Sequence, residues 1–250
     1  MHRFHLPPEA CRTDVPLLTG PEAHHALRVL RVRAGDRITV LDGAGTVLLC
    51  EAQTPQRDTL PLRVIHRELV PPPVHQITLL AAVLKGKSFE TVLQKATELG
   101  VSRIVPLVTQ RTVAQPHDEA AGKVAKWERV VLEAVKQCGN PWLPQVNAPV
   151  TPTEYFAQAE ACDLALVASL AGDGRHPREY FREFATARNR APQTVAVWVG
   201  PEGDFTPEEY TRIREAGVQP ITLGPLVLRA ETAALYCLAV VSYELQSRSS

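Results

Sequence analysis

The chain has 250 residues, of which 45% are hydrophobic, so it can bury a full core and is long enough for two domains. Its 27 lysine and arginine residues balance its 27 aspartate and glutamate residues, so net charge excludes a strongly basic or acidic protein. The five cysteines form no Cys-x-x-Cys pair, which argues against a disulfide framework and a zinc site. Because no signal-like or membrane-spanning apolar run is present, we expect a soluble cytoplasmic protein.

Three consecutive prolines at 71–73 form neither a helix nor a central strand, and we expect residues 71–75 to be an extended linker between two domains. Residues 1–70 are predicted to form a compact β-barrel that one helix interrupts, with Pro21 near the start of that helix and Leu30 at its end. The expected strands of the barrel are residues 3–6, 36–41, 47–53 and 60–67, with a turn at 42–45.

After the prolines, short apolar runs alternate with helical patterns over residues 76–250, which indicates a parallel sheet covered by helices on both faces. The expected strands are residues 77–84, 103–108, 164–168, 194–199 and 220–223. Two helices have clear starts, because Thr151-Pro-Thr-Glu154 and Thr206-Pro-Glu-Glu209 both match a capping box with proline at the first helical position.

Two glycine-bearing loops carry the strongest functional signal. Trp198-Val-Gly-Pro-Glu-Gly-Asp-Phe205 and Leu223-Gly-Pro-Leu-Val-Leu-Arg-Ala-Glu-Thr-Ala-Ala234 each follow an expected strand and open onto a helix. Open α/β folds bind ligands at this carboxyl edge of the sheet, and loops rich in backbone groups suit a flat ligand such as an adenine nucleoside. Arg229 opposes the dipole of the following helix, which favours a functional role. Glu231 and Thr232 fit a function or simple stabilisation of the helix start equally well.

Other nucleotide-binding and catalytic motifs are incomplete. Gly86-Lys-Ser88 lacks the glycine that a phosphate-binding loop needs at position 81, so we interpret it as a polar loop with Ser88 as a helix cap. Lys85 and Lys87 could meet nucleic acid phosphates from that loop. No Gly-x-Gly-x-x-Gly follows an expected strand and no Gly-x-Ser-x-Gly is present, which disfavours a dinucleotide site and a serine nucleophile. The eight histidines lack ligand spacing, so we expect no metal.

Together these segments resemble the ribosomal small subunit (16S) rRNA methyltransferase E family, uridine N3-methyltransferases of the SPOUT superfamily, over nearly the whole chain. The segments that carry the resemblance are His25-Ala-Leu-Arg-Val-Leu-Arg31, residues 87–105 with Gln94-Lys95 and Glu98-Leu-Gly100, Trp127 through Gln137-Cys138-Gly139, Gly200-Pro-Glu-Gly-Asp-Phe205, Leu223-Gly224 and Leu228-Arg-Ala-Glu-Thr232.

The resemblance implies an RNA-binding, PUA-like β-barrel at 1–70 and a SPOUT methyltransferase domain at 76–250, whose C-terminal segment forms a trefoil knot. It also implies a homodimer that binds S-adenosyl-L-methionine (SAM) in the knot loops and methylates uridine N3 in 16S rRNA or the small ribosomal subunit. The residues that it places at the cofactor are Leu170, Gly200, Pro201, Glu202, Gly203, Leu223, Gly224, Leu228, Arg229, Thr232 and Ala233.

For this reaction we expect Arg229 to stabilise the negative charge that spreads onto the uracil oxygens when N3 loses its proton. The acceptor of that proton stays open between Glu231, Glu202 and water. Arg28 and Arg31 are three residues apart, so on a helix they would share a face and could grip phosphates. The cations expected to meet RNA are Arg3, Arg28, Arg31, Arg33, Lys85, Lys87 and Arg111.

Three positions depart from the family pattern, which often has arginine at Leu226 and Asn140 and glycine at Asp204. If those arginines contact RNA, other cations must replace them here. The candidates are Arg175, Arg178 and Arg111.

Two other functions stay open. One is a SPOUT enzyme that methylates a ribose 2′-hydroxyl, although the asparagine-led motif usual in the last loop of those enzymes is absent. The other is a non-catalytic RNA-binding or ribosome-assembly protein, which the intact glycine loops disfavour.

Overall fold

The computed structural model describes residues 2–112, 120–158 and 161–246, and the chain divides into two compact units. The first unit comprises Met1–Pro72 together with Leu132–Leu143, and the second comprises Pro73–Val131 together with Pro144–Ser250. The division after Pro72 falls within the three consecutive prolines, whereas nothing in the sequence indicates that residues 132–143 belong with the first unit.

The first unit is built on one five-stranded sheet, most of which the alternating apolar pattern predicts. Its strands are β1 (His2–His5), β2 (Leu17–Leu18), β3 (Arg37–Leu41), β4 (Thr46–Ala52) and β5 (Leu60–Leu69). The sheet order is β1-β3-β4-β5-β2, with β1 parallel to β3 and the other neighbours antiparallel. The inward side chains form a separate core that includes Phe4, Leu18, Ile38, Leu48 and Leu62.

The predicted helix of the first unit is present, but it is less regular than expected. It consists of α1 (Gly20–His24), with proline in its first turn, and a π-helical turn η2 (His25–Val29). Arg31 lies beyond this segment with a left-handed φ of 55°. The expectation that Arg28 and Arg31 share a helical face is therefore wrong, because the helix ends before Arg31 and the last turn is not α-helical.

The end of α3 (Ala120–Cys138) is joined to α1 of the first unit by a buried ion pair. The Lys136 side chain is 8% exposed, and its Nζ lies 2.8 Å from Glu22 and 2.7 Å from Glu133. Burial opposes the charge of Lys136, but hydrogen bonds to the two carboxylates outweigh it and raise the pKa of the ammonium group. Removing Lys136 would leave the largely buried carboxylate of Glu22 without this partner, which is costly.

The second unit is built on a six-stranded sheet in which all neighbouring strands are parallel. Its strands are β6 (Gln76–Ala82), β7 (Arg103–Leu107), β8 (Gln145–Val146), β9 (Leu164–Ala168), β10 (Thr194–Val199) and β11 (Gln219–Ile221). The order is β11-β9-β10-β6-β7-β8. After β6, the chain adds β7 and β8 on one side of β6. It then adds β9, β10 and β11 on the other side, so the direction of strand order changes between β6 and β10, which is a topological switch point.

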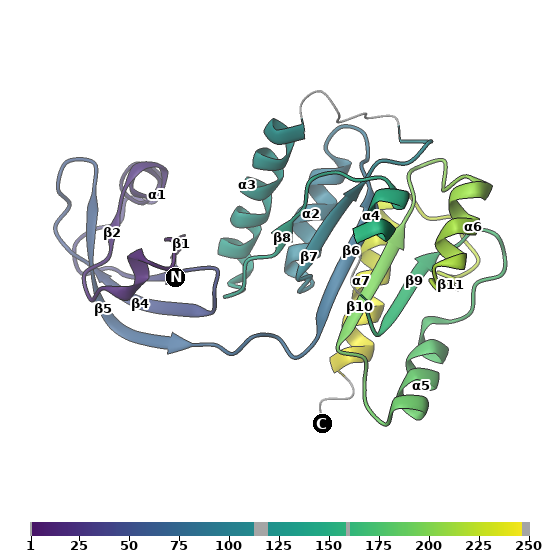
Figure 1. Ribbon diagram of the computed structural model, residues 1–250. Coiled ribbons are helices and arrows are strands. Elements are labelled where there is room, and N and C mark those ends of the chain that lie inside the picture. The colour runs from purple at the N-terminus through teal and green to yellow at the C-terminus, as the bar shows by residue number, and fades with distance from the viewer. Residues whose placement is uncertain (1, 113–119, 159–160, 247–250) are drawn as a thin grey trace. The chain divides into compact units, whose positions relative to one another are not determined.

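Helices cover both faces of this sheet, as predicted (Figure 1). The helices of the second unit besides α3 are α2 (Ser88–Glu98), α4 (Pro152–Gln158), α5 (Pro177–Arg188), α6 (Pro207–Glu215) and α7 (Ala230–Gln246). Along β10, Val195 and Val197 belong to the core shared with α2, α5 and α7. Trp198 faces the other core, where it stacks on Phe156 of α4 with ring centroids 4.9 Å apart. This alternation explains why β10 reads as one continuous apolar run.

Helix starts follow local side-chain chemistry in two of the three predicted cases. Thr206 Oγ1 accepts the Glu209 N–H at 3.3 Å, while a Glu209 carboxylate oxygen accepts the Thr206 N–H at 3.0 Å, which confirms this capping box. The equivalent bonds between Thr151 and Glu154 confirm the other. The prediction that Ser88 caps a helix is wrong, because Ser88 is the first residue of α2 and no side chain caps that helix.

Membrane-spanning helices and metal-binding clusters are both absent from the described residues. None of their helices combines the length and apolar character needed to cross a membrane. No group of three or more histidine, cysteine, aspartate or glutamate residues among them is arranged to hold a metal ion.

Candidate cofactor-binding site

A cavity of about 480 Å³ lies at the carboxyl edge of the second sheet, beside the switch point between β6 and β10. Its walls are the segments that follow β9, β10 and β11, together with the first residues of α2 and α7. The lining residues are Ser88, Ala168, Ser169, Leu170, Val199, Gly200, Pro201, Glu202, Asp204, Leu223, Gly224, Leu226, Val227, Leu228, Arg229, Ala230, Glu231 and Ala233. This volume lies within the range of roughly 300–1,000 Å³ typical of small-molecule sites.

The loop after β10 is folded tightly on itself. A Cβ atom at Gly200 would lie 2.8 Å from the Asp204 carboxylate and 3.1 Å from the Phe205 backbone nitrogen, so only glycine fits without displacing the loop. Asp204 adopts a left-handed φ of 59°, and its Oδ1 accepts the N–H of Phe205 at 2.8 Å. The loop thus turns sharply between β10 and the capped start of α6.

The loop after β11 also depends on glycine, but for a different reason. Gly224 has a φ of 102° with open space around its Cα, so its backbone conformation rather than crowding requires glycine. Leu226 and Val227 follow and are 75% and 79% exposed. Arg229 comes immediately before α7, and its carbonyl accepts the Ala233 N–H at 2.8 Å.

The loop after β9 is held by a network of polar contacts from α6. The Tyr210 hydroxyl lies 2.6 Å from Ser169 Oγ and 3.1 Å from an Asp173 carboxylate oxygen. Ser169 in turn donates to Asp173 at 2.8 Å, and Arg214 forms an ion pair with the same carboxylate. Ser169 and Leu170 both line the cavity, so this network fixes one of its walls.

The structure brings together most of the residues that the sequence predicts for the cofactor. Nine of them line one cavity: Leu170, Gly200, Pro201, Glu202, Leu223, Gly224, Leu228, Arg229 and Ala233. Gly203 does not, because it packs against Arg111, whose side chain would lie 3.3 Å from a Cβ there. Thr232 is an exposed residue inside α7 and neither caps that helix nor lines the cavity.

The predicted site residues do not include the other lining residues, which are Ser88, Ala168, Ser169, Val199, Asp204, Leu226, Val227 and Ala230. Most of them stand at strand ends or in the two glycine loops, so their position after an expected strand is a signal that could have found them. Ser169 and Leu170 follow β9, which lies between β10 and β11 in the sheet.

Acidic side chains dominate the charge of the cavity. Its described ionisable side chains are Glu202, Asp204 and Glu231 against Arg229. Glu202 and Arg229 are exposed, whereas Asp204 and Glu231 are half-buried. Burial is the largest influence on Asp204 and raises the pKa of its carboxyl group, although the Phe205 N–H and Arg111 oppose this rise.

Three predicted RNA-contacting cations flank the cavity within the second unit. Arg111 follows β7, is exposed and donates through Nη1 to the backbone carbonyl of Gly203. Glu209 of α6 holds the same segment by accepting the Gln110 N–H at 2.9 Å. Lys85 and Lys87 are exposed in the loop that leads to Ser88.

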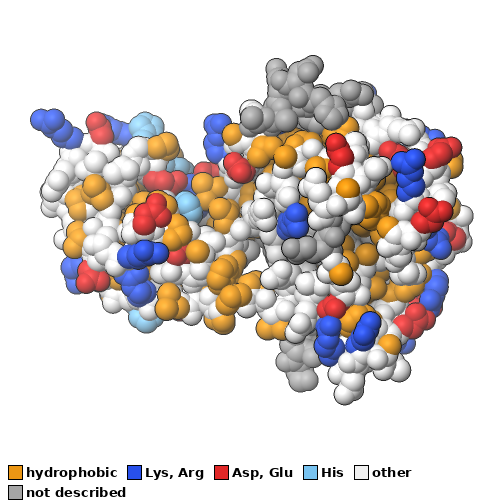
Figure 2. All heavy atoms as spheres, in the orientation of Figure 1, with side chains coloured by type: hydrophobic (Ala, Val, Ile, Leu, Met, Phe, Trp, Pro, Cys, Tyr) orange, Lys and Arg blue, Asp and Glu red, His pale blue; other side chains and the backbone are white. Residues whose placement is uncertain are grey.

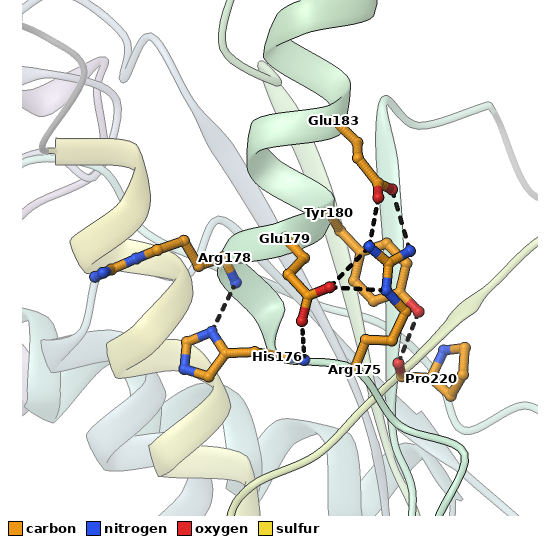
Figure 3. A network of polar contacts seen from close by, with 7 residues as sticks. All are labelled: Arg175, His176, Arg178, Glu179, Tyr180, Glu183 and Pro220. Carbon is orange, nitrogen blue, oxygen red and sulfur yellow. Dashed lines mark hydrogen bonds and ion pairs between the residues drawn. The ribbon is translucent and has the colours of Figure 1, made fainter.

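Arg175 and Arg178, by contrast, are engaged in ion pairs at the start of α5, and Figure 3 shows those of Arg175. Arg175 donates to Glu179 at 2.9 Å and to Glu183 at 3.2 Å, and its guanidinium lies 4.7 Å from the centroid of the Tyr180 ring. Arg178 donates through Nε to Glu244 of α7 at 2.7 Å, a residue that Figure 3 does not draw. Of these three candidates, Arg111 is the one whose side chain contacts a loop next to the cavity.

The predicted RNA-contacting arginines of the first unit differ in their surroundings. Arg3 donates to the carbonyl of Gln137 at 2.8 Å and so caps the end of α3. Arg28 lies 3.9 Å from Asp58, with both side chains largely exposed. Arg31 and Arg33 are exposed and form no side-chain ion pair among the described residues. On the face seen in Figure 2, basic and acidic side chains are interspersed rather than separated by sign.

Comparison with known proteins agrees with this architecture. The model of an RNA methyltransferase domain matches residues 70–242, and that of an RNA methyltransferase PUA domain matches residues 18–65. The chain is 32% identical to Ribosomal RNA small subunit methyltransferase E of Synechocystis sp., covering 98% of this chain and 78% of the relative. It is 29% identical to the protein of the same name from Bacillus subtilis, over 92% and 90% of the two chains.

Solved structures also match over nearly the whole chain, and two of them are bound to the cofactor. Ribosomal RNA small subunit methyltransferase E from Neisseria gonorrhoeae, bound to S-adenosyl methionine, is 29% identical with a TM-score of 0.82 over 97% of both chains. A structure presented as a methyltransferase from Legionella pneumophila, in complex with its bound cofactor SAM, is 29% identical with a TM-score of 0.86 over 96% of both chains.

The fold, the cavity and the matched domains define an α/β RNA methyltransferase with a PUA-like first domain, which confirms the predicted fold class. Each of the two sheets is packed against hydrophobic cores of its own, in agreement with two domains. The chain belongs to the ribosomal RNA small subunit methyltransferase E family, as its sequence motifs predict.

Proposed function

We propose that this protein transfers the methyl group of SAM to N3 of a uridine in 16S rRNA and so takes part in the maturation of the small ribosomal subunit. The observation that carries this proposal is the cavity formed by the three loops at the carboxyl edge of the sheet. The chain that forms this cavity matches Ribosomal RNA small subunit methyltransferase E proteins over almost its full length, and one of these proteins is bound to SAM.

The residues of the cavity fit this cofactor. Its size suits a nucleoside-sized ligand, and at Gly200 and Gly224 the lining has no side chain to come between the backbone and an adenine or a ribose. The side chains of Leu223 and Leu228 supply apolar walls. When bound, SAM supplies an electrophilic methyl group on a sulfonium ion. We propose the predicted set of residues as the cofactor site, although two of its members, Gly203 and Thr232, lie outside the cavity.

We assign the main catalytic role to Arg229. The N3 proton must leave before uridine becomes a good nucleophile, and negative charge then spreads onto the uracil carbonyl oxygens. Arg229 lines the cavity, is exposed to an incoming base and has no acidic partner among the described residues, so its guanidinium is available to stabilise that charge. Glu231 and Glu202 line the same cavity, and either of them or water accepts the proton.

The RNA substrate would be held by cations of both units. Arg28, Arg31 and Arg33 belong to the PUA-like domain, which we assign to residues 1–70, and can contact phosphates there. Lys85, Lys87 and Arg111 would do the same for the methyltransferase domain at 76–250. Arg3 is the weakest member of the predicted set, because its guanidinium already caps α3.

The remaining expectations concern assembly and location. A homodimer is supported by apolar side chains left exposed on the second unit: Leu226, Val227, Tyr236 and Tyr243. A trefoil knot is supported by the return of α7 to pack against α2 and α5 after the chain has formed the edge strand β11. A cytoplasmic location fits an enzyme that acts on ribosomal RNA.

The experiment that tests the catalytic assignment compares single-turnover methyl transfer by Arg229→Ala with that of the wild type at saturating SAM. Removing one charge-stabilising group costs about 100-fold in rate, so we expect a loss of that order. Arg188→Ala, which changes an exposed arginine in the last turn of α5, serves as the matched control and should leave the rate unchanged. A rate for Arg229→Ala within threefold of the wild type would contradict the assignment.

A further inference from the structure

Asp204 stands in a backbone conformation that glycine would adopt without strain. Its φ of 59° lies in the left-handed region, where a residue with a Cβ atom is disfavoured and aspartate is only better tolerated than most. A non-glycine residue kept in such a conformation at a ligand cavity points to a role for its side chain. Asp204 lines the cavity, so that role concerns what the cavity binds.

Two acidic residues in the loops of the cavity are Glu202 and Asp204, and the Asp204 carboxylate is the less solvated of the two. Its Oδ1 accepts the Phe205 N–H at 2.8 Å and would lie 2.8 Å from a Cβ atom at Gly200. The carboxylate therefore packs closely against the backbone of its own loop. Glu202 is exposed, so water screens its charge. Glu231 is in the first turn of α7, where the helix dipole already stabilises it.

The cavity as a whole favours a positively charged ligand. Three of its four described ionisable side chains are acidic, namely Glu202, Asp204 and Glu231, and Arg229 is the one cation. Arg111 lies behind Gly203 and donates to the backbone there, so it compensates the Asp204 charge in part. A half-buried carboxylate interacts more strongly with a nearby cation than an exposed one does, because less water screens the pair.

We propose that Asp204 makes this cavity selective for SAM over the reaction product S-adenosyl-L-homocysteine. The inference rests on the proposed function, because it assumes that SAM is the ligand. SAM carries an ammonium group, a carboxylate and a sulfonium ion, whereas the product has a neutral thioether in place of the sulfonium. The two molecules therefore differ by one positive charge, and the Asp204 carboxylate attracts SAM more than the product. This preference lets SAM compete better against the product for the cavity and so limits product inhibition of the enzyme.

The test is isothermal titration calorimetry on the full chain with SAM, S-adenosylhomocysteine and sinefungin, an analogue with a protonated amine at the sulfonium position. Asp204→Asn keeps the shape of the side chain and removes its charge, and Asp204→Gly relieves the left-handed strain and so should fold at least as well as the wild type. Glu208→Gln removes an exposed acid outside the cavity and is the control.

We expect both Asp204 variants to bind SAM and sinefungin about tenfold more weakly, which corresponds to about 1.4 kcal/mol, and to bind S-adenosylhomocysteine within twofold of the wild type. Equal losses for all three ligands would overturn the inference, because Asp204 would then contact a part that they share. Unchanged affinities would overturn it as well. If the wild type bound none of the three, the proposed function itself would fail.

Discussion

Gly200→Ala tests how far the cavity depends on the tight packing of its central loop. The added Cβ would lie 2.8 Å from Asp204 Oδ1, 3.1 Å from the Phe205 nitrogen and 3.2 Å from Phe205 Cδ2. Contacts of this kind are normally at least about 3.4 Å, so the loop must move by several tenths of an ångström, and overpacking of this kind costs about 1–3 kcal/mol. For a chain of this length, 1 kcal/mol lowers Tm by about 2–4 °C.

We expect Gly200→Ala to lower Tm by about 3–10 °C and to weaken SAM binding about tenfold, measured by differential scanning calorimetry and titration calorimetry. Gly122→Ala is the matched control: Gly122 lies in α3 with an ordinary φ and no heavy atom near its added Cβ, so stability should rise slightly and binding should not change. Adding Asp204→Gly removes the 2.8 Å contact, and the double variant should recover part of the affinity for S-adenosylhomocysteine. Unchanged Tm and affinity in Gly200→Ala would refute this reasoning.

Three other predictions follow from particular contacts. Tyr210→Phe removes the hydroxyl that contacts Ser169 at 2.6 Å, so SAM should bind about threefold more weakly while Tm changes by only a few degrees; equal affinity in titration calorimetry would refute a role for this network. Asp163 is paired with Arg190 at 2.7 Å, and this hydrogen bond holds the pKa of the Asp163 carboxyl group well below its usual range. The ionised carboxylate therefore stabilises the fold above about pH 4, and this stabilisation is lost progressively as the pH falls further. Asp163→Asn should therefore unfold at lower urea concentration than the wild type at pH 7, and this gap should narrow towards pH 3; a gap independent of pH would contradict the assignment. Arg28→Ala should weaken binding to small-subunit RNA in filter-binding assays and flatten its salt dependence, and an unchanged salt slope would move the RNA surface elsewhere.

Much of the second unit could be predicted from its sequence because its strands are buried on both faces. The expected strands 164–168 and 194–199 coincide with β9 and β10, which are continuous apolar runs. The capping boxes at Thr151 and Thr206 could be predicted as well, because they depend only on residues three apart. By contrast, β2 and β8 have two residues each, too few to show any period.

Other features depend on contacts between residues far apart in the chain, which no local pattern contains. The pairing of Lys136 with Glu22 joins residues 114 positions apart and ties the end of α3 to the first unit. Arg178 and Glu244, which form an ion pair, are 66 positions apart. This pairing makes Arg178 less available to RNA than the sequence suggests. Burial and pairing, unlike residue type, follow from the tertiary fold.

The candidate site shows the same division between local and tertiary information. Glycines after expected strands indicated the cavity correctly, since the carboxyl edge of a parallel sheet and its switch point follow from strand order. Gly203 and Thr232 belong to the same motifs but lie outside the cavity, because a motif does not specify which of its residues face inward. Asp204 also lines the cavity, with a left-handed φ of 59° that could not be predicted from the sequence.

The central claim is best tested by following the transfer of labelled methyl from SAM to small ribosomal subunits that lack this modification, with nucleoside analysis of the digested RNA. We predict that the label appears in 3-methyluridine with the wild type and falls about 100-fold in initial rate with Arg229→Ala. Label in a 2′-O-methylated nucleoside would contradict the proposed chemistry, and no label in either subunits or naked 16S rRNA would contradict the proposed substrate.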